Sequence, residues 1–302
     1  MRRLDIPVGE SFEGAGAHKL LRSRGFSQTL LRELKDGRSL LINDLPARTV
    51  DILHAGDTVS VIFPDETSFA VPNPGLKADI VYTDEDIAVF DKPPGMPVHQ
   101  SFGHKDDTLA NLFAALYPEC AFRAVNRLDK DTSGLVVVAK NKLAAGWLMH
   151  DRRCRPQKHY YAVTDEGMCE KYGMSGEIIA PIAREREEEI KRVVREDGAY
   201  SHTKYRVIER GNGFCLSEIT LLTGRTHQIR VHFAHIGFPL AGDSLYGGDM
   251  SCIQRQALHC GCMQLVHPVT GVELSLVSPL PEDIAGLLRQ CLPDSELTQS
   301  YK

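Results

Sequence analysis

The most informative part of the chain is residues 126–139, with the sequence Asn-Arg-Leu-Asp-Lys-Asp-Thr-Ser-Gly-Leu-Val-Val-Val-Ala. Asp129 stands between Arg127 and a turn-forming Thr-Ser-Gly, and the turn leads into an apolar run typical of a buried strand. A turn at a sheet edge is where a rigid scaffold can present one reactive carboxylate. Alone, the segment could equally be a hairpin-like turn in which Asp131 and Ser133 only hydrogen-bond the backbone. Other segments must decide between these interpretations.

The length and composition allow a large core. The chain has 302 residues, of which 42% are hydrophobic and 25% charged, as in ordinary globular proteins. This is enough for one large domain and one small one. No apolar run approaches the roughly 20 residues that span a bilayer, and no signal-peptide core follows the basic N-terminus. We therefore expect a cytoplasmic protein without membrane contact, and a monomer.

The eight cysteines are scattered rather than arranged as a disulfide framework. The closest group is Cys252, Cys260 and Cys262, with His259 and His267 nearby. Structural zinc sites usually show two paired Cys or Cys/His couples, and none is present. We expect buried, reduced thiols and no metal site.

The charge distribution is uneven. The net charge is −5, yet between residues 123 and 158 nine Lys or Arg residues stand against three Asp, a local excess of six positive charges. Such a cluster can be a solvated basic face. Because it surrounds Asp129, a surface that binds a polyanion is the sharper interpretation.

Residues 1–63 read as a small separate unit. Apolar spacing predicts two short helices separated by a Ser27 cap and ended by Gly37, followed by strands at residues 40–42 and 58–63. The helical part is rich in cations, namely Lys19, Arg22, Arg24, Arg32, Lys35 and Arg38. The layout resembles the alpha-L RNA-binding module of a small-subunit ribosomal protein and of many RNA-modifying enzymes, through Phe26-Ser27, Leu30, Ile42-Asn43 and Gly56-Asp57-Thr58-Val59. The alternative is a cap domain without an RNA role.

A proline-containing linker is expected at residues 64–77, a catalytic domain at 78–294 and a flexible tail at 295–302. Strand patterns occur at residues 79–82, 87–90, 135–139, 160–163, 203–208 and 214–222. Helical patterns follow Asp107 or Thr108, surround Trp147, and run from Thr226 to Gly237. Since strands and helices do not alternate regularly, we predict an α+β fold with a mixed, mainly antiparallel sheet.

Three further segments carry recognisable motifs, at residues 91–99 (Asp-Lys-Pro-Pro-Gly-Met-Pro-Val-His), 158–163 (Lys-His-Tyr-Tyr-Ala-Val) and 222–247, which begins Leu-Thr-Gly-Arg-Thr-His-Gln-Ile-Arg-Val-His. Together with Arg127-Leu128-Asp129 they resemble the motifs of the RluA-type pseudouridine synthases. The resemblance extends over roughly residues 78 to 290 and includes the segments 255–259 and 267–268. One departure is Asn126, where many members have histidine, which raises a question of substrate preference or local hydrogen bonding.

The resemblance implies an enzyme that isomerises uridine in RNA to its carbon glycoside, with Asp129 as the acid beside the ribose. The acid either adds to the sugar or abstracts a sugar proton to give a glycal, and both routes stay open. An ionised, desolvated carboxylate requires a nearby cation, and the family's arginine is assigned to Arg225. Tyr160 is implied to stack on uracil and to place its hydroxyl near carbon 5. Its neighbour Tyr161 would point to the other face of the strand.

The same resemblance places Arg127 in the space that the extruded nucleotide leaves. Lys92 and Lys158 are expected to steady phosphates or nearby carboxylates, and Thr132 and Leu245 to line the substrate site. The chemistry requires no metal, nucleotide or redox cofactor. We expect RNA as the partner, with large-subunit ribosomal RNA first and transfer RNA second. His227, His232 and His235 are interpreted as structural or rim residues.

Two other functions could use some of the same residues, a glycosidase and a non-catalytic RNA-binding protein. A glycosidase would need a second acid, for which Asp131 is the candidate, but nothing in the sequence marks it as buried. A non-catalytic RNA-binding or ribosome-assembly protein would use the same basic surface. Such a protein would not need Asp129 at all, so the joint presence of Asp129, Tyr160 and Arg225 favours the enzyme.

Overall fold

The computed structural model describes residues 2–34 and 39–291. The predicted stop at Gly37, the cations Lys35 and Arg38, and the tail at 295–302 lie outside these residues. The N-terminal unit is a four-stranded sheet in the order β1-β4-β2-β3 with two helices and a 3-10 turn, η1. The bounds are β1 Arg2–Pro7, η1 Glu10–Phe12, α1 Ala17–Ser23, α2 Gln28–Glu33, β2 Leu40–Ile42, β3 Leu45–Pro46 and β4 Thr58–Phe63.

Local sequence explains most of this unit. The Ser27 hydroxyl accepts a hydrogen bond from the Leu30 amide at 3.1 Å, which caps α2 as predicted. Leu20, Leu21 and Leu30 are buried in a core separate from that of the rest of the chain. β1 was not predicted, because only one of its six residues is buried and its sequence is highly charged. It forms through its antiparallel pairing with β4.

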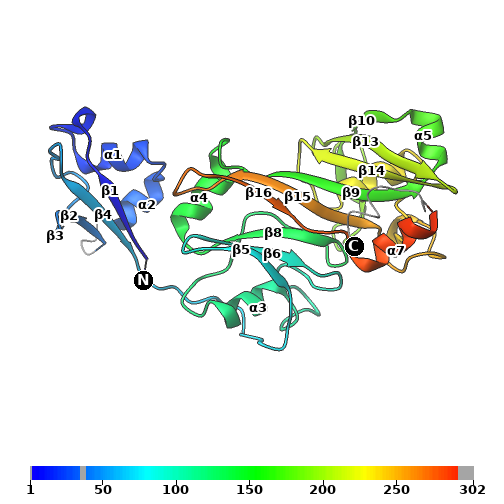
Figure 1. Cartoon of the computed structure of the whole chain (residues 1–302), viewed down its shortest axis with the longest axis horizontal. Helices are drawn as coiled ribbons and strands as arrows, with labels where there is room; N and C mark the ends of the chain where they lie inside the picture. Colours follow the sequence, from blue (N-terminus) through cyan, green and yellow to red (C-terminus); the bar gives the residue numbers. More distant parts are fainter. Residues whose placement is uncertain (1, 35–38, 292–302) are drawn as a thin grey trace.

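The larger part of the chain forms one ten-stranded sheet in the order β10-β13-β14-β9-β15-β8-β6-β5, with β16 paired to β15 and β7 paired to β8 (Figure 1). Every pairing is antiparallel except that of β15 with β8, which confirms the predicted mixed, mainly antiparallel sheet. The bounds are β5 Asp79–Thr83, β6 Ile87–Lys92, β7 Arg123–Ala124, β8 Ser133–Ala139, β9 Gln157–Asp165, β10 Ser175–Ile179, β13 His202–Gly211, β14 Phe214–Leu221, β15 Leu258–Val266 and β16 Glu273–Val277.

The helices pack around this sheet, and a separate hairpin joins β11 (Ile182–Arg184) to β12 (Arg192–Val194). Thr108 caps α3 through a capping box with Asn111, and Tyr117 ends it just before Pro118. The predicted helix from Thr226 begins at Gln228. The bounds are α3 Leu109–Leu116, α4 Lys142–His150, α5 Gly167–Tyr172, α6 Gln228–His235, η3 Ser244–Tyr246 and α7 Glu282–Cys291.

A close approach between β8 and β15 explains the glycine in the Thr-Ser-Gly turn. Gly134 has φ +111°, and a Cβ there would collide with the backbone of Cys260 on β15. His259 and Cys260 pair with Ser133 and Gly134 in parallel register. The turn at residues 129–134 is therefore fixed by a strand that lies more than a hundred residues further along the chain.

The N-terminal unit contacts the sheet domain through α4 (Figure 1). Leu143 belongs to the core of the N-terminal unit, and Trp147 packs against that core and against the core of the sheet domain. Gly25, with φ +82°, is required where the indole lies directly against the backbone. Lys142 adds an ion pair to Glu33 at 2.9 Å. Within the described residues, no helix is long and apolar enough to cross a membrane.

Candidate active site

The turn that carries Asp129 is held from behind by Asn126. The Asn126 side chain is buried, donates to the Leu135 carbonyl at 3.0 Å and accepts from the Val137 amide at 2.9 Å. Both partners belong to β8. Asn126, which stands where many family members have histidine, therefore points into the sheet and clamps the turn to β8.

Four side chains from distant segments fix the rest of the turn, and the Thr132 amide closes it onto the Asp129 carbonyl at 3.1 Å. Lys92 binds the Lys130 carbonyl at 3.0 Å, and Arg255 binds the Asp131 carbonyl at 3.0 Å. The remaining contacts are Gln256 to the Thr132 hydroxyl at 3.2 Å and His259 to the Ser133 hydroxyl at 3.0 Å. Such support from rigid elements holds a reactive group in one geometry.

Lys92 does not lie where an RNA phosphate could reach it. Its side chain is fully buried and donates to the carbonyls of Pro93 and Lys130 at 2.7 and 3.0 Å. Burial lowers the pKa of Lys92 to about 7, although the charges of Asp131 and Asp129 oppose this. Of the two expected roles for Lys92, the phosphate contact does not fit this burial, whereas Asp131 and Asp129 lie near enough for their charges to act on its amine. Lys92 also supports the turn through its bond to the Lys130 carbonyl.

The cation that pairs with Asp129 is Arg230 and not Arg225. Arg230 Nη1 lies 3.1 Å from Asp129 Oδ2, while its Nε and Nη2 bind the two oxygens of Asp243 at 2.7 and 2.8 Å. Asp243 is fully buried. Burial alone would lower the pKa of Arg230, but hydrogen bonding to Asp243 and the charges of Asp243 and Asp129 raise it well above its usual value. Arg230 is thus a permanent cation beside Asp129.

Arg225 occupies the rim of the same cavity. It follows β14, is exposed, and donates through Nε to the Tyr200 carbonyl at 3.3 Å. Its backbone amide is held by the Gln228 side chain at 3.0 Å. Sequence could not separate Arg225 from Arg230, because both lie in the same motif and only the packing of α6 on Asp243 turns Arg230 toward Asp129.

Tyr160 and Tyr161 point to opposite faces of β9. Tyr160 is buried and lines the cavity with Asp129, whereas the Tyr161 hydroxyl lies 3.6 Å from Cys262 Sγ and its ring packs against a different core. Burial, followed by the charges of Cys260 and Asp129, raises the pKa of Tyr160 well above its usual value. Its phenol therefore keeps its proton at neutral pH.

His227, which was interpreted as a structural or rim residue, and Tyr246, which the sequence did not assign, complete the site. His227 begins α6 with φ 57°, and its Nε2 lies 3.8 Å from Asp129 Oδ2. Its Nδ1 lies 2.9 Å from the Tyr246 hydroxyl, and the Arg230 guanidinium lies 5.0 Å above the Tyr246 ring. Burial lowers the pKa of His227, which favours the neutral imidazole. By contrast, His232 is structural, because it binds Thr203 and the Ala180 carbonyl.

Asp129, Tyr160, His227 and Arg230 line a cavity of about 60 Å³ that opens at the surface. Arg127 is exposed at its rim and Thr132 is buried in its wall. Leu245 is not part of this lining and lies in a neighbouring pocket beside Tyr246. Lys158 is half-buried two residues before Tyr160 and does not line the cavity either.

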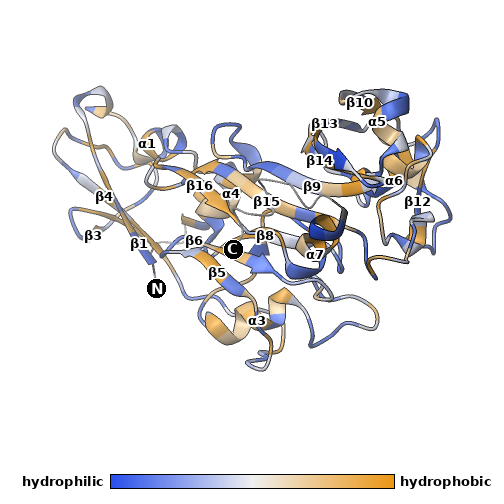
Figure 2. Cartoon of the chain, turned by 45° about the vertical axis from the view of Figure 1, so that its right-hand side comes forward, coloured by the Kyte–Doolittle hydropathy of each residue, from blue (hydrophilic) through white to orange (hydrophobic). Residues whose placement is uncertain are grey.

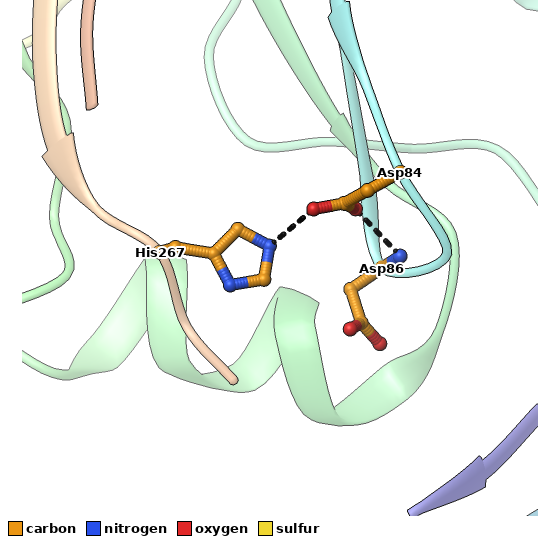
Figure 3. Close-up of side chains that lie close together, drawn as sticks. All are labelled: Asp84, Asp86 and His267. Carbon is orange, nitrogen blue, oxygen red and sulfur yellow. Dashed lines mark hydrogen bonds and ion pairs between the residues drawn. The ribbon is translucent and has the colours of Figure 1, made fainter. Parts of the chain in front are cut away.

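A separate cluster of Asp84, Asp86 and His267 has the residue types of a metal site (Figure 3). His267 Nδ1 accepts from the amides of Val269 and Thr270, so Nε2 carries the proton and faces Asp84 at 2.8 Å. Asp84 also accepts from the amides of residues 86 and 87. Asp86 accepts from the Asn141 side chain at 2.7 Å and pairs with Arg2 at 3.2 Å. Because these partners occupy the ligand atoms, we interpret the cluster as a structural tie between the β5–β6 hairpin and the end of β15.

Cysteine chemistry does not enter the site. The seven cysteines whose side chains are described are all free thiols. Four of them are buried as expected, but Cys120 and Cys262 are partly buried and Cys252 is exposed. Cys260 lies behind Tyr160, and burial raises its pKa to about 12. Within the described residues, Cys252, Cys260 and Cys262 do not converge with a histidine into a cluster of possible metal ligands.

Comparison with known proteins identifies the family. The profile of the RNA pseudouridylate synthase family matches residues 86–235. The chain is 36% identical to the uncharacterized RNA pseudouridine synthase YlyB of Bacillus subtilis, over 95% of this chain and 98% of that protein. It is 39% identical to the ribosomal large subunit pseudouridine synthase D of Pseudomonas aeruginosa, over 87% of each.

Solved structures give the same answer for the fold. Human RNA Pseudouridylate Synthase Domain Containing 1 superposes with a TM-score of 0.57 and 27% identity, over 72% of this chain and 89% of that one. The family match and the relatives thus define the class of this protein as an RNA-modifying isomerase. The chain belongs to the RluA-type RNA pseudouridine synthase family.

Proposed function

We propose that this protein converts a specific uridine of structured RNA, in large-subunit ribosomal RNA, to pseudouridine with Asp129 as the reacting group. The observation that carries the proposal is the Asp129 carboxylate, paired with Arg230 and facing the same cavity as Tyr160. A protein that only binds RNA would gain nothing from a carboxylate here, since it would repel phosphate.

The reaction moves one bond. The bond between the ribose anomeric carbon and uracil N1 breaks, the base turns, and carbon 5 is joined to the sugar. Carbon 5 then loses its proton, and N1 gains one. Asp129 either adds to the anomeric carbon or removes a sugar proton to give a glycal. Arg230 stabilises the carboxylate, and Tyr160 supplies a stacking surface with a protonated hydroxyl near carbon 5.

Access to a base within folded RNA requires that the nucleotide leave its stack, at a cost of about a few kcal/mol. Arg127 is exposed at the cavity rim and pairs with no carboxylate among the described residues. A guanidinium can stack in the vacated space and contact phosphate together. We assign this role to Arg127 and a neighbouring phosphate-contact role to Arg225. Thr132 contacts the nucleotide from the cavity wall, and Leu245 and Lys158 act outside it.

The choice of ribosomal RNA is supported by relatives whose names specify the large subunit. Transfer RNA is the second candidate. The N-terminal unit, residues 1–63, is proposed to bind RNA through exposed cations on α1 and α2 and the turn between them. Lys19, Arg22, Arg24 and Arg32 are all exposed and form no ion pair with any described residue. We propose a cytoplasmic monomer that needs no cofactor.

Release of tritium from RNA labelled at uracil carbon 5 tests the proposal. The wild-type protein is expected to release it, and Asp129→Ala to abolish release while RNA binding and Tm stay nearly unchanged. Asp131→Ala is the matched control, because Asp131 lies in the same turn and should be dispensable. It would be essential in a two-carboxylate glycosidase mechanism. Full release by Asp129→Ala would remove Asp129 from the mechanism.

A further inference from the structure

The hairpin of β11 and β12 is bonded to the active site through one hydroxyl group. β12 packs against α6, the helix that carries Arg230 (Figure 2). The Arg192 amide of β12 donates to the Tyr246 hydroxyl at 3.0 Å, and the same oxygen lies 2.9 Å from His227 Nδ1. His227 in turn faces Asp129. The position of the Arg192 backbone is therefore set by the groups around the catalytic carboxylate.

The Arg192 side chain has donors but no acceptor. Its Nη1 is buried without a hydrogen-bond partner, and its guanidinium forms no ion pair with a described residue. Native structures rarely leave a buried charged donor unpaired. Burial lowers the pKa of Arg192, and the positive charges of Arg184 and Arg127 lower it further, with only Tyr246 in opposition. The guanidinium thus lies in a field that is already positive.

Three other cations of the hairpin do have carboxylate partners. Arg186, Lys191 and Arg195 are ion-paired with Glu189, Glu185 and Asp197, at 3.3, 3.4 and 2.5 Å. Arg184, Arg192 and Arg127 have no carboxylate partner among the described residues. Ion pairs therefore neutralise three cations of the hairpin. Arg184 and Arg192, which lie near each other and near Arg127 at the cavity rim, are not neutralised by a described carboxylate.

An RNA phosphate is the acceptor that fits this arrangement. Arg192 lines an open pocket of about 450 Å³ beside Tyr246, and Tyr246 also borders the catalytic cluster. A ribose that reaches Asp129 must bring its flanking phosphates within a nucleotide's length. A planar guanidinium with free N–H groups binds phosphate in a bidentate manner. The Asp129 carboxylate would repel a small free anion. A phosphate that belongs to the bound RNA is held near Arg192 by the rest of the nucleotide and is therefore the expected ligand.

We propose that Arg192 binds the backbone phosphate next to the extruded uridine, and that the β11–β12 hairpin is a phosphate-contacting arm of the active site. The inference rests on the proposed function, because it assumes that RNA enters the cavity at Asp129. Arg192 is assigned to substrate binding alone. Bond breaking remains with Asp129, Tyr160 and Arg230.

The test compares Arg192→Gln with Arg195→Gln, which removes an ion-paired arginine from the same hairpin. The probe is an unmodified large-subunit ribosomal RNA transcript, bound at several KCl concentrations. Arg192→Gln is expected to raise Kd about tenfold and to reduce the slope of log Kd against log[KCl] by about one phosphate contact. In tritium release, KM should rise and kcat should stay unchanged. Arg195→Gln should match the wild type in all three.

Arg192→Lys separates the contribution of the positive charge from that of the bidentate guanidinium geometry. Lysine keeps the cation without the bidentate fork, so the salt slope should remain that of the wild type while Kd rises modestly. The proposal is overturned if Arg192→Gln keeps the wild-type slope, or if kcat falls with no change in slope. The latter would assign Arg192 to the positioning of Tyr246. A wild-type protein that binds the transcript without tritium release would instead refute the proposed function, while the binding comparison still decides the role of Arg192.

Discussion

Asp243 accepts two hydrogen bonds from Arg230, at 2.7 and 2.8 Å, and so leaves Nη1 of the same guanidinium to reach Asp129 at 3.1 Å. The two carboxylates share one cation, but they differ in exposure. Asp243 is completely buried, whereas the Asp129 side chain is 23% exposed and can meet a substrate. Asp243 therefore orients Arg230, and Arg230 orients and stabilises the carboxylate of Asp129, the proposed reacting group.

Arg230→Met should be costly for both stability and activity. The substitution leaves the buried Asp243 without its cation, which typically costs about 3–5 kcal/mol of unfolding free energy. It also removes the partner of Asp129, so kcat for tritium release should fall by about a hundredfold or more. Urea unfolding and single-turnover assays measure the two effects. Arg225→Met is the control and should change the unfolding free energy by less than about 0.5 kcal/mol. Equal stability losses in both variants would contradict the assignment of the ion pair to Arg230.

Tyr160→Phe separates the ring of Tyr160 from its hydroxyl. The ring remains to stack on uracil, so RNA affinity should be nearly unchanged. A neutral phenol can relay the proton that leaves carbon 5 by passing its own proton on to water, so loss of the hydroxyl should lower kcat by about a hundredfold, the scale of general acid–base catalysis. Tyr161→Phe is the matched control on the opposite face of β9. If tritium release is as fast in Tyr160→Phe as in the control, the hydroxyl has no role in proton transfer.

Features that depend on residues close together in the sequence could be predicted. The apolar run of β8, the caps at Ser27 and Thr108, and the opposite orientation of Tyr160 and Tyr161 all follow from local periodicity and side-chain hydrogen bonding. The mainly antiparallel sheet followed from the irregular order of strands and helices.

The features that could not be predicted depend on contacts between residues far apart in the sequence. β15 contains Gly261 and five polar or sulfur-containing residues, so its sequence did not look like a central strand. It lies between β8 and β9 only because Gly134 permits the close approach to Cys260. In the same way, Arg230 reaches Asp129 only because Asp243 draws α6 into place. Such relationships are set by tertiary packing and leave no periodic signal.

Asn126→Ala tests whether the clamp behind the reactive turn matters. The variant would leave the Leu135 carbonyl and the Val137 amide without this partner, so the unfolding free energy should fall by about 1–3 kcal/mol. Because the clamp lies three residues before Asp129, kcat should also fall, while the Kd for RNA stays close to that of the wild type. Urea unfolding, tritium release and a binding titration measure these quantities. An unchanged unfolding free energy would show that Asn126 does not hold β8.

Lys92 should make stability depend on pH in a defined direction. Its pKa is about 7 in the folded protein against an ordinary value of 10.5, so between these values the unfolded chain binds one more proton. Raising the pH through this window therefore favours folding, by up to about 1.4 kcal/mol per pH unit. Lys92→Met should remove this contribution, so urea unfolding at about pH 7 and about pH 8.5 should give a smaller rise for the variant than for the wild type. The exposed Lys105→Met is the control and should keep the full wild-type rise. Parallel curves for wild type and Lys92→Met would mean that the buried amine stays charged throughout, held by Asp131 and Asp129 more strongly than burial opposes it.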